Sequence, residues 1–596
     1  MIFRATHRGL KALPPRRTIG VACLFLLVFV LFGYQYLQNP FSFNSDNLYC
    51  LQFCDDLLHG RDMQGFHVPA APYLFPDMVL LLPCVALTSN LSAIFFLYSA
   101  AYYTLLLGVL RAILRGTGVA GRTAFAAAAL GVTFFLAAHF DPAYVTHNIL
   151  MFHAGNHMGC LLIGLGAVAF VQRALRDGYD WRCAILFVFV CALSGFSDQL
   201  LIVQFLVPIG AAALPLAAFR LVPARRAMVT IVLLGLSTML ALKGRIPFQK
   251  LGLVPMRVMH VESGLFANAS GALGQFTASW WYIAKDQPLV WVVLFLHLLA
   301  ALVAIGVWAR RGRCSPAPSD VSASEPRLDG TAVLFVALVL LFAPLANAAA
   351  LIVTESVSPA FVVRYLYTWW FLPFLCLLLW SSLLPWRAVR LLPWIVAAFV
   401  GFRIVSYPEA LSGDRLAPRY PPLAQALDEM VRKYGPLRGF AEYWHTREVK
   451  YLTKRHLDVL PILGYGAPWF HSINPNAYLS DDPHDLSIPD YHFVVFAVGG
   501  EAGPDREQIR ARYGEPVEII SVAGYDIWRY ERMDNRQLDL FLRAQLAQRL
   551  VRNKPFLGPA QPVRLRQPKR NLTPCAERGN IHLQRGEPLT VRFDKP

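Results

Sequence analysis

Charged residues are scarce in this sequence: Asp, Glu, Lys and Arg make up 16% of the 596 residues, against 56% hydrophobic residues. A soluble protein would carry about a quarter charged residues. Apolar stretches of about twenty residues recur through the first two thirds of the chain, and each could span roughly 30 Å of hydrocarbon. Because backbone groups in lipid must be hydrogen-bonded within their own segment, the composition predicts an α-helical polytopic membrane protein.

Several motifs are also missing. The ten cysteines include no zinc-like CxxC pair, and most of them lie in apolar stretches, which argues against a zinc site or a disulfide framework. No P-loop and no GxGxxG followed by a helix occurs, so a nucleotide site is not expected. The net charge is +17, but much of the basic excess lies in short loops between apolar stretches. That distribution is typical of membrane orientation, and no nucleic acid partner is expected.

The apolar stretches predict spans at about 19–37, 74–89, 91–110, 123–138, 154–172, 183–197, 200–219, 227–243, 288–308, 331–354, 369–385 and 392–406. The joining segments alternate between basic and acidic or His-rich, and the positive-inside rule places the basic ones, with the N-terminus, in the cytoplasm. The first two spans after residue 73 break this alternation, since together they must cross an odd number of times. Either one of them is re-entrant or interfacial, or the division between them is wrong, and we expect about 11–13 transmembrane helices.

Composition divides the chain into three parts. Residues 1–406 form the predicted transmembrane module, with a first outer loop at 38–73 and a Pro/Ser-rich cytoplasmic linker at 309–330. Residues 407–552 predict a small periplasmic α/β domain, with YHFVVFAV as a buried strand and GPDREQIRARYG as an amphipathic helix. Residues 553–596 are a basic, Pro-rich tail.

The stretch FNSDNLYCLQFCDDLLHG, just after the first span, is rich in carboxylates. Its apolar residues recur at helical spacing, which predicts a short helix over 46–58 lying on the membrane surface with its apolar side down. Asp46 stands in the first turn, where a carboxylate is either a helix cap or a functional group. Asp55 and Asp56 are either a solvated face or further functional acids.

Two other predicted outer segments contain candidates. HFDPAYVTHNILMFHAGNH places His153 and His157 at i, i+4 spacing, which could hold a metal, although without an HExxH motif polar interface residues are the alternative. Weaker candidates near the first loop are His59, His67 and Asp77. In ESVSPAFVVRYLYTWW, Arg364 lies at the outer end of a span, where it could either bind a phosphate or extend to lipid headgroups.

Four features together resemble the GT-C superfamily of integral-membrane glycosyltransferases: the basic N-terminus, the large first outer loop with SDNLY, the late RYLY and the C-terminal α/β domain. The resemblance is closest to the protein O-mannosyltransferase and aminoarabinose-transferase branch and its bacterial relatives. It implies an enzyme of the bacterial inner membrane that moves a sugar from a polyprenyl-phosphate donor. The acceptor would be a glycan, a lipid or a protein at the outer face.

The resemblance also implies roles for particular residues. Asp46 would be the catalytic base, with Asp55 or Asp56 as alternates, because Asn47 stands where the better-known Asp-Glu pair has its second acid. The expected donor-phosphate ligands are Arg364, Tyr365, Arg245 and Lys285. We assign no metal ligands, although the first-loop acid of this superfamily can hold a divalent metal.

Three alternatives to a glycosyltransferase stay open. A flippase or transporter of lipid-linked glycans would need paired ionisable residues near the middle of several spans. An O-antigen ligase or polymerase would carry its main soluble part in a mid-chain loop, whereas here it is C-terminal. A non-catalytic membrane scaffold would not depend on Asp46.

Overall fold

The computed structural model describes residues 14–37, 43–138, 152–244, 329–353, 371–381, 391–406, 420–479, 487–498 and 504–552, apart from short gaps within some ranges and a few isolated positions elsewhere. The chain divides into two compact units. Unit 1 comprises Met1–Pro421 with Arg447–Lys454 and His471–Asn474, and unit 2 comprises the rest. Two short segments that follow the last predicted span therefore belong with the helices of unit 1.

Unit 1 is built from helices, and its described helices are α1 (Pro15–Leu37), α2 (Ser45–Leu58), η2 (Leu74–Met78), α3 (Val79–Leu87), α4 (Leu91–Gly116), α5 (Gly121–Ala138), α7 (Met158–Asp177), α8 (Trp181–Ser197), η4 (Ile202–Leu206), α9 (Val207–Ala218), α10 (Ala224–Lys243), α14 (Gly330–Val353), α17 (Leu372–Ser381) and α19 (Leu392–Ser406). Its two short strands, β1 (His67–Val68) and β2 (Val254–Pro255), pair in parallel. Every predicted span contains a helix except 288–308, which lies largely outside the described residues.

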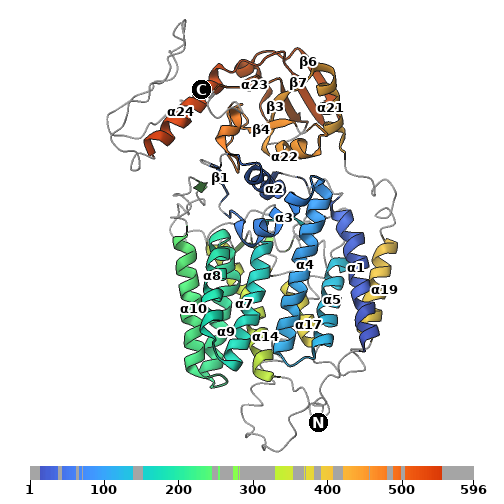
Figure 1. Ribbon diagram of the computed structural model, residues 1–596, viewed down its shortest axis with the longest axis vertical. Coiled ribbons are helices and arrows are strands. Elements are labelled where there is room, and N and C mark those ends of the chain that lie inside the picture. Colours follow the sequence, from blue (N-terminus) through green and yellow to red (C-terminus); the bar gives the residue numbers. More distant parts are fainter. Residues whose placement is uncertain are drawn as a thin grey trace, which may run out of the picture. The chain divides into compact units, whose positions relative to one another are not determined.

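Within the described residues, five helices are long and apolar enough to cross a membrane: Pro15–Gly33, Leu91–Gly116, Met158–Asp177, Ala224–Lys243 and Gly330–Ile352. Shorter apolar helices accompany them. Figure 1 shows α4, α5 and α7 side by side, and α4 contacts both of the others. The chain is therefore a helical membrane protein, as its composition predicts.

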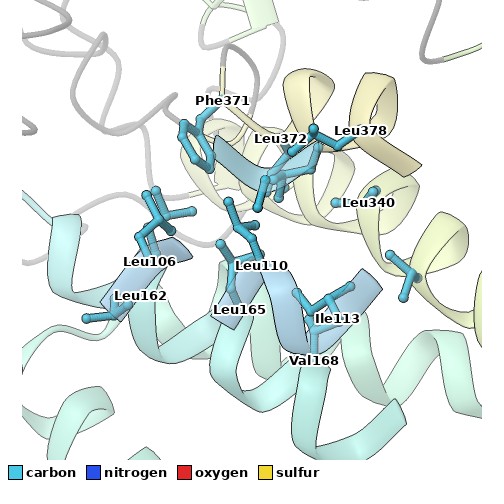
Figure 2. Packing of buried hydrophobic residues seen from close by; sticks show 14 of the residues in the cluster. Leu106, Leu110, Ile113, Leu162, Leu165, Val168, Leu340, Phe371, Leu372 and Leu378 are labelled. Atoms are coloured by element: carbon cyan, nitrogen blue, oxygen red, sulfur yellow. The ribbon is translucent and has the colours of Figure 1, made fainter. Parts of the chain in front are cut away.

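One part of the core of unit 1 is a layer of aliphatic side chains between helices. Figure 2 shows Leu110 and Ile113 of α4 facing Leu165 and Val168 of α7, with Leu340 of α14 close by. Each pair is three residues apart, so both of its members lie on one face of their helix. All five side chains are buried.

The basic ends of α4, α7 and α10 lie together in unit 1. The backbone N–H of Asp329, before α14, donates to the carbonyl of Thr117 after α4, at 3.0 Å. Arg226 on α10 donates through Nη1 to the carbonyl of Leu175 on α7, at 2.9 Å. The turns that follow α4 and α7 thus meet the starts of α10 and α14. Figure 1 shows α2 and α3 at the opposite end of unit 1.

The helical segment formed by η2 and α3 is short. It runs from Leu74 to Leu87, which at about 1.5 Å per residue is about 20 Å, against roughly 30 Å of hydrocarbon. It contacts α2 as well as α4. Its length favours the re-entrant alternative for the first of the two stretches that broke the predicted alternation.

Unit 2 is an α/β unit with a five-stranded sheet in the order β4-β3-β5-β7-β6. The strands are β3 (Arg438–Glu442), β4 (Asp458–Ile462), β5 (Phe493–Ala497), β6 (Glu518–Val522) and β7 (Tyr525–Arg529). Strand β3 is parallel to β4 and β5, while β7 is antiparallel to β5 and β6. The described helices from residue 422 onward are α21 (Pro422–Tyr434), α22 (Tyr443–Leu452), η6 (Pro475–Tyr478), α23 (Arg506–Tyr513) and α24 (Arg536–Arg552).

The predicted YHFVVFAV strand and the predicted helix within GPDREQIRARYG are confirmed as β5 and α23. The sheet buries an aromatic group in which the ring of Phe440 stacks on Tyr491, with centroids 4.2 Å apart, and on Tyr513 at 5.6 Å. Helix α22 is shared, since its residues from Arg447 onward group with unit 1.

Candidate functional site

Helix α2 carries the first candidate, Asp46, in its first turn as predicted. The helix does not lie on a surface with one apolar side down, however, because its buried residues occur on all sides. Side chains that the pattern assigned to solvent have partners instead. Asn156 donates through Nδ2 to Oδ1 of Asn47 at 2.6 Å, and Arg447 donates through Nε to Oε1 of Gln52 at 2.6 Å. These contacts make α2 an internal element of unit 1.

A turn with three left-handed residues packs against α2. Gly155, Asn156 and His157 have φ angles of 94°, 55° and 70°, and α7 begins directly afterwards. A Cβ atom on Gly155 would lie 3.2 Å from Sγ of Cys50 on α2, so this position needs glycine for space as well as for its φ angle. Left-handed Asn and His residues persist where surrounding contacts impose them, as they do in ligand sites and tight turns.

His157 forms a buried pair with a carboxylate from the far end of α8. Its Nδ1 lies 2.6 Å from Oδ2 of Asp198, and the two side chains are 5% and 6% exposed. The hydroxyl of Tyr73 lies 3.3 Å from the other ring nitrogen, Nε2. The three side chains thus form a hydrogen-bonded chain from Tyr73 through His157 to Asp198.

Asp77 of η2 lies on the other side of the same turn. Its Oδ1 accepts from the hydroxyl of Tyr98 at 2.8 Å and from the backbone N–H of Gly155 at 3.2 Å, and the residue is 2% exposed. Asp77 stands in the first turn of η2. Its contacts also hold the left-handed turn against α4. We refer to Asp77, Tyr98, His157, Asp198 and Tyr73 as the polar cluster.

Asp46 lies close enough to the polar cluster to act on a common neighbour. Burial raises the pKa of the Cys50 thiol well above its ordinary value, and the carboxyls of Asp77 and Asp46 raise it further, while Arg447 lowers it. Cys50 is thus within electrostatic reach of both acids. Asp46 is only partly buried, whereas Cys50 is fully buried. Helix α2 itself contacts the turn of the polar cluster, since Asn47 is hydrogen-bonded to Asn156 and Cys50 lies against Gly155.

No protein-family model matches the chain, and comparisons with curated proteins and with solved structures gave no significant match. The function must therefore be argued from the site itself.

The described residues do not fit a metal site. No three His, Cys, Asp or Glu side chains among them are gathered so that they could hold an ion. His153 and His157 diverge despite their i, i+4 spacing. The ring of His153 packs on Phe95, with centroids 4.5 Å apart, while His157 turns to Asp198.

The other predicted acids of α2 have cationic or potentially cationic neighbours. Asp55 lies 3.2 Å from Nδ1 of the exposed His59. Asp56 is buried, and its Oδ1 accepts from Nη1 of Arg61 at 2.8 Å.

The predicted phosphate ligands Arg364, Tyr365, Arg245 and Lys285 lie outside the described residues.

Asp198, like Tyr73 and Tyr98, was not predicted as a site residue from the sequence. It is a single acid in the sequence GFSDQLL, between two apolar stretches that were read only as spans. An ionisable side chain at the end of a membrane span raises the free energy of the folded protein unless it has a partner. The position of Asp198 between two spans was therefore a signal in the sequence. Its partner, His157, lies 41 residues earlier, so the sequence offers no local pattern that joins them.

Proposed function

We propose that this protein is a GT-C-like membrane glycosyltransferase of the bacterial inner membrane, which moves a sugar from a polyprenyl phosphate to a glycan, lipid or protein acceptor at the outer face. The observation that carries the proposal is the place of Asp46. This carboxylate stands in the first turn of the helix that follows the first span, and that helix is packed beside the polar cluster.

The proposed chemistry needs a base and a leaving group. The acceptor hydroxyl oxygen attacks the anomeric carbon, its proton passes to the Asp46 carboxylate, and the bond from that carbon to the phosphate oxygen breaks. Polyprenyl phosphate leaves with the bonding electrons, so no nucleotide is required. Attack from the face opposite the phosphate would invert the anomeric configuration, as in single-displacement glycoside chemistry. A neighbouring network of fixed hydrogen bonds supports such a base by holding its surroundings in place.

The leaving phosphate needs a cation, and our proposal for this role comes from the sequence alone. Arg364 presents a planar fork of donors that suits phosphate oxygens, with Tyr365, Arg245 and Lys285 as further contacts.

The proposed orientation is supported by the charge of the loops. The last turns of α4 and α7 carry Arg115 and Arg176, and these basic helix ends lie together at the end of unit 1 away from α2. The positive-inside rule assigns that end to the cytoplasm and α2 to the outer face. If Leu74–Leu87 does not cross, the remaining predicted spans number about 11 and leave the C-terminal α/β domain outside.

A flippase or transporter is less well supported. Such proteins bind their substrates and ions through ionisable residues near the middle of their spans. In the described spans, Asp, Glu, Lys and Arg occur only toward the helix ends, as Arg111 and Arg115 do on α4. The acids gather instead near α2, where the proposed transfer reaction would take place.

The decisive experiment replaces Asp46 by Asn. Asp46 is the second residue of α2 and Asn has nearly the same size and shape, so membrane levels of the variant should be unchanged. An amide cannot accept the proton of the acceptor hydroxyl, so sugar transfer should fall by about 10²-fold or more. Transfer would be measured as glycan modification in cells, with protein levels checked in the membrane fraction. Asp55→Asn, on the other side of the same helix, is the matched control. Full transfer by Asp46→Asn would exclude Asp46 as the base.

A further inference from the structure

Arg447 on α22 is a buried arginine, 3% exposed, that contacts α2 through its guanidinium group. Nε donates to Oε1 of Gln52 at 2.6 Å, and Nη1 donates to the carbonyl oxygen of Ser45 at 2.9 Å. Nη2 donates to the carbonyl oxygen of Ser472, and the backbone N–H of Arg447 lies 3.4 Å from Oγ of Ser45. All four residues belong to unit 1. One arginine, placed far after the last predicted span, therefore joins two points on α2.

The Arg447 contacts with α2 are all made to one face of that helix. Ser45 and Gln52 are seven residues apart, which is about two helical turns, so they lie on the same side of the helix. Asn47 is rotated by roughly 200° from Ser45 and is bonded to Asn156 on the other side. Asp46 lies between these two faces, about 100° from each. Contacts on both sides fix the rotation of α2 about its axis and therefore the direction in which Asp46 points.

Arginine suits this position for a physical reason. The three acceptors are an amide oxygen and two backbone carbonyls, and a buried cation needs several such bonds to offset the loss of water. The guanidinium supplies donors in a fixed plane, whereas a lysine ammonium is a single point on a flexible stem. A change from Arg447 to Lys keeps the charge but cannot reproduce contacts in three directions.

We propose that Arg447 is a positioning residue, which fixes the first two turns of α2 and thereby the direction of the Asp46 carboxylate. The role of Asp46 in this inference rests on the function proposed above. The inference adds that the segment after the last span helps to build the site that follows the first span. Two measurements separate the structural part of the inference from its catalytic part.

The first measurement reports on α2 without reference to activity. Cys50 and Cys54 lie on α2 and are 0% and 1% exposed, so their thiols react with maleimide only when the helix loosens. The full-length protein in detergent would be labelled and each cysteine followed by mass spectrometry. We expect Arg447→Lys to speed labelling of both thiols about tenfold or more. Arg455→Lys is the control, because the Arg455 side chain is exposed.

The second measurement is the rate of sugar transfer per folded molecule. Arg447→Lys should lower kcat about tenfold or more, since small misplacements of a catalytic group are costly. The KM for the lipid-linked donor should stay within about twofold, because uniform binding is not affected. If Arg447→Lys does not accumulate, Gln52→Leu removes one acceptor while leaving the arginine in place, and the same two measurements apply with smaller effects.

The outcomes are distinct. Unchanged labelling in both variants would overturn the claim that Arg447 fixes α2. Faster labelling with an unchanged kcat would overturn the positioning of Asp46, since α2 would then be held for stability alone. Absence of transfer in the wild-type protein would overturn the proposed function. The labelling rates would still decide whether Arg447 holds α2 in place.

Discussion

Asp46, Asp55 and Asp56 share one short helix, but their side chains have different neighbours. Asp55 is nine residues from Asp46, which turns it by about 180° around the helix, so the two cannot act on one substrate atom from the same side. The buried Asp56 accepts from Nη1 of the exposed Arg61 at 2.8 Å. Their positions and neighbours therefore favour Asp46 as the base, and Asp55 and Asp56 as structural residues.

Asp56 leads to a prediction about stability and pH. Burial raises the pKa of its carboxyl above the usual value, although Lys450 and Arg61 oppose this effect. A raised folded-state pKa means that the folded protein binds the proton more tightly, so this contribution to stability is present below about pH 4 and is lost as the pH rises through the folded pKa. Asp56→Asn should therefore gain stability relative to the wild type as the pH rises from about 4 to 7.

The measurement for Asp56 is the thermal unfolding midpoint of the purified protein in detergent over this pH range. Asp180→Asn is the control, since Asp180 caps the start of α8 and Asn caps equally well. A variant that loses stability steadily toward neutral pH would show that the ion pair with Arg61 outweighs burial.

At the scale of elements, helix α7 can approach η4 closely because Gly164 has no side chain at their contact. A Cβ atom on Gly164 would lie 2.2 Å from the ring of Phe205, whereas a Cβ atom on Gly166 would meet no atom within 4 Å. Small residues allow membrane helices to approach closely, and dispersion contacts then replace the hydrophobic effect, which lipid does not provide. Gly164 therefore has a packing role that its neighbour Gly166 does not share.

The two glycines form a matched test. Gly164→Ala should destabilise the protein by about 1–3 kcal/mol, the usual cost of overpacking a core. Gly166→Ala should be neutral or slightly stabilising, because alanine has the higher helix propensity. Thermal unfolding midpoints of both variants in the same detergent provide the comparison. Equal midpoints would mean that Phe205 moves aside at no cost and that the close approach is not needed.

At the scale of the whole molecule, the described basic loops and α2 lie at opposite ends of unit 1. Arg176 and Arg226 contribute to the basic end, and α2 carries acids at the other. The proposed site requires the acidic end to face outward, where lipid-linked sugars are available. The positive-inside rule predicts this orientation.

Fusions to a phosphatase that is active only outside the cytoplasm test this orientation. A fusion after Pro596 should be active, and a fusion after Gly118, in the turn that follows the basic end of α4, should be inactive. A third fusion, after Ser89 between α3 and α4, should be active if Leu74–Leu87 does not cross. The opposite pattern at Pro596 and Gly118 would remove the basis for placing Asp46 at the outer face.

The sequence by itself determined the parts of this protein that depend on local pattern. Apolar length predicted the helices of unit 1, because a segment in lipid must form its own hydrogen bonds. Periodicity predicted the helix over 46–58 and the YHFVVFAV strand of the C-terminal unit. Each of these patterns depends only on residues that are close together in the sequence. The acid in the first turn of α2 was visible for the same reason.

Only the tertiary structure decided which polar residues meet. His157 and Asp198 are 41 residues apart, Asn47 and Asn156 are 109 apart, and Arg447 is 395 residues from Gln52. No periodic pattern links such distances, and each buried polar group is stable only because the packing of several helices brings its partner within reach. The same packing turned α2 from the expected surface helix into an internal one, since its polar faces found protein partners in place of water.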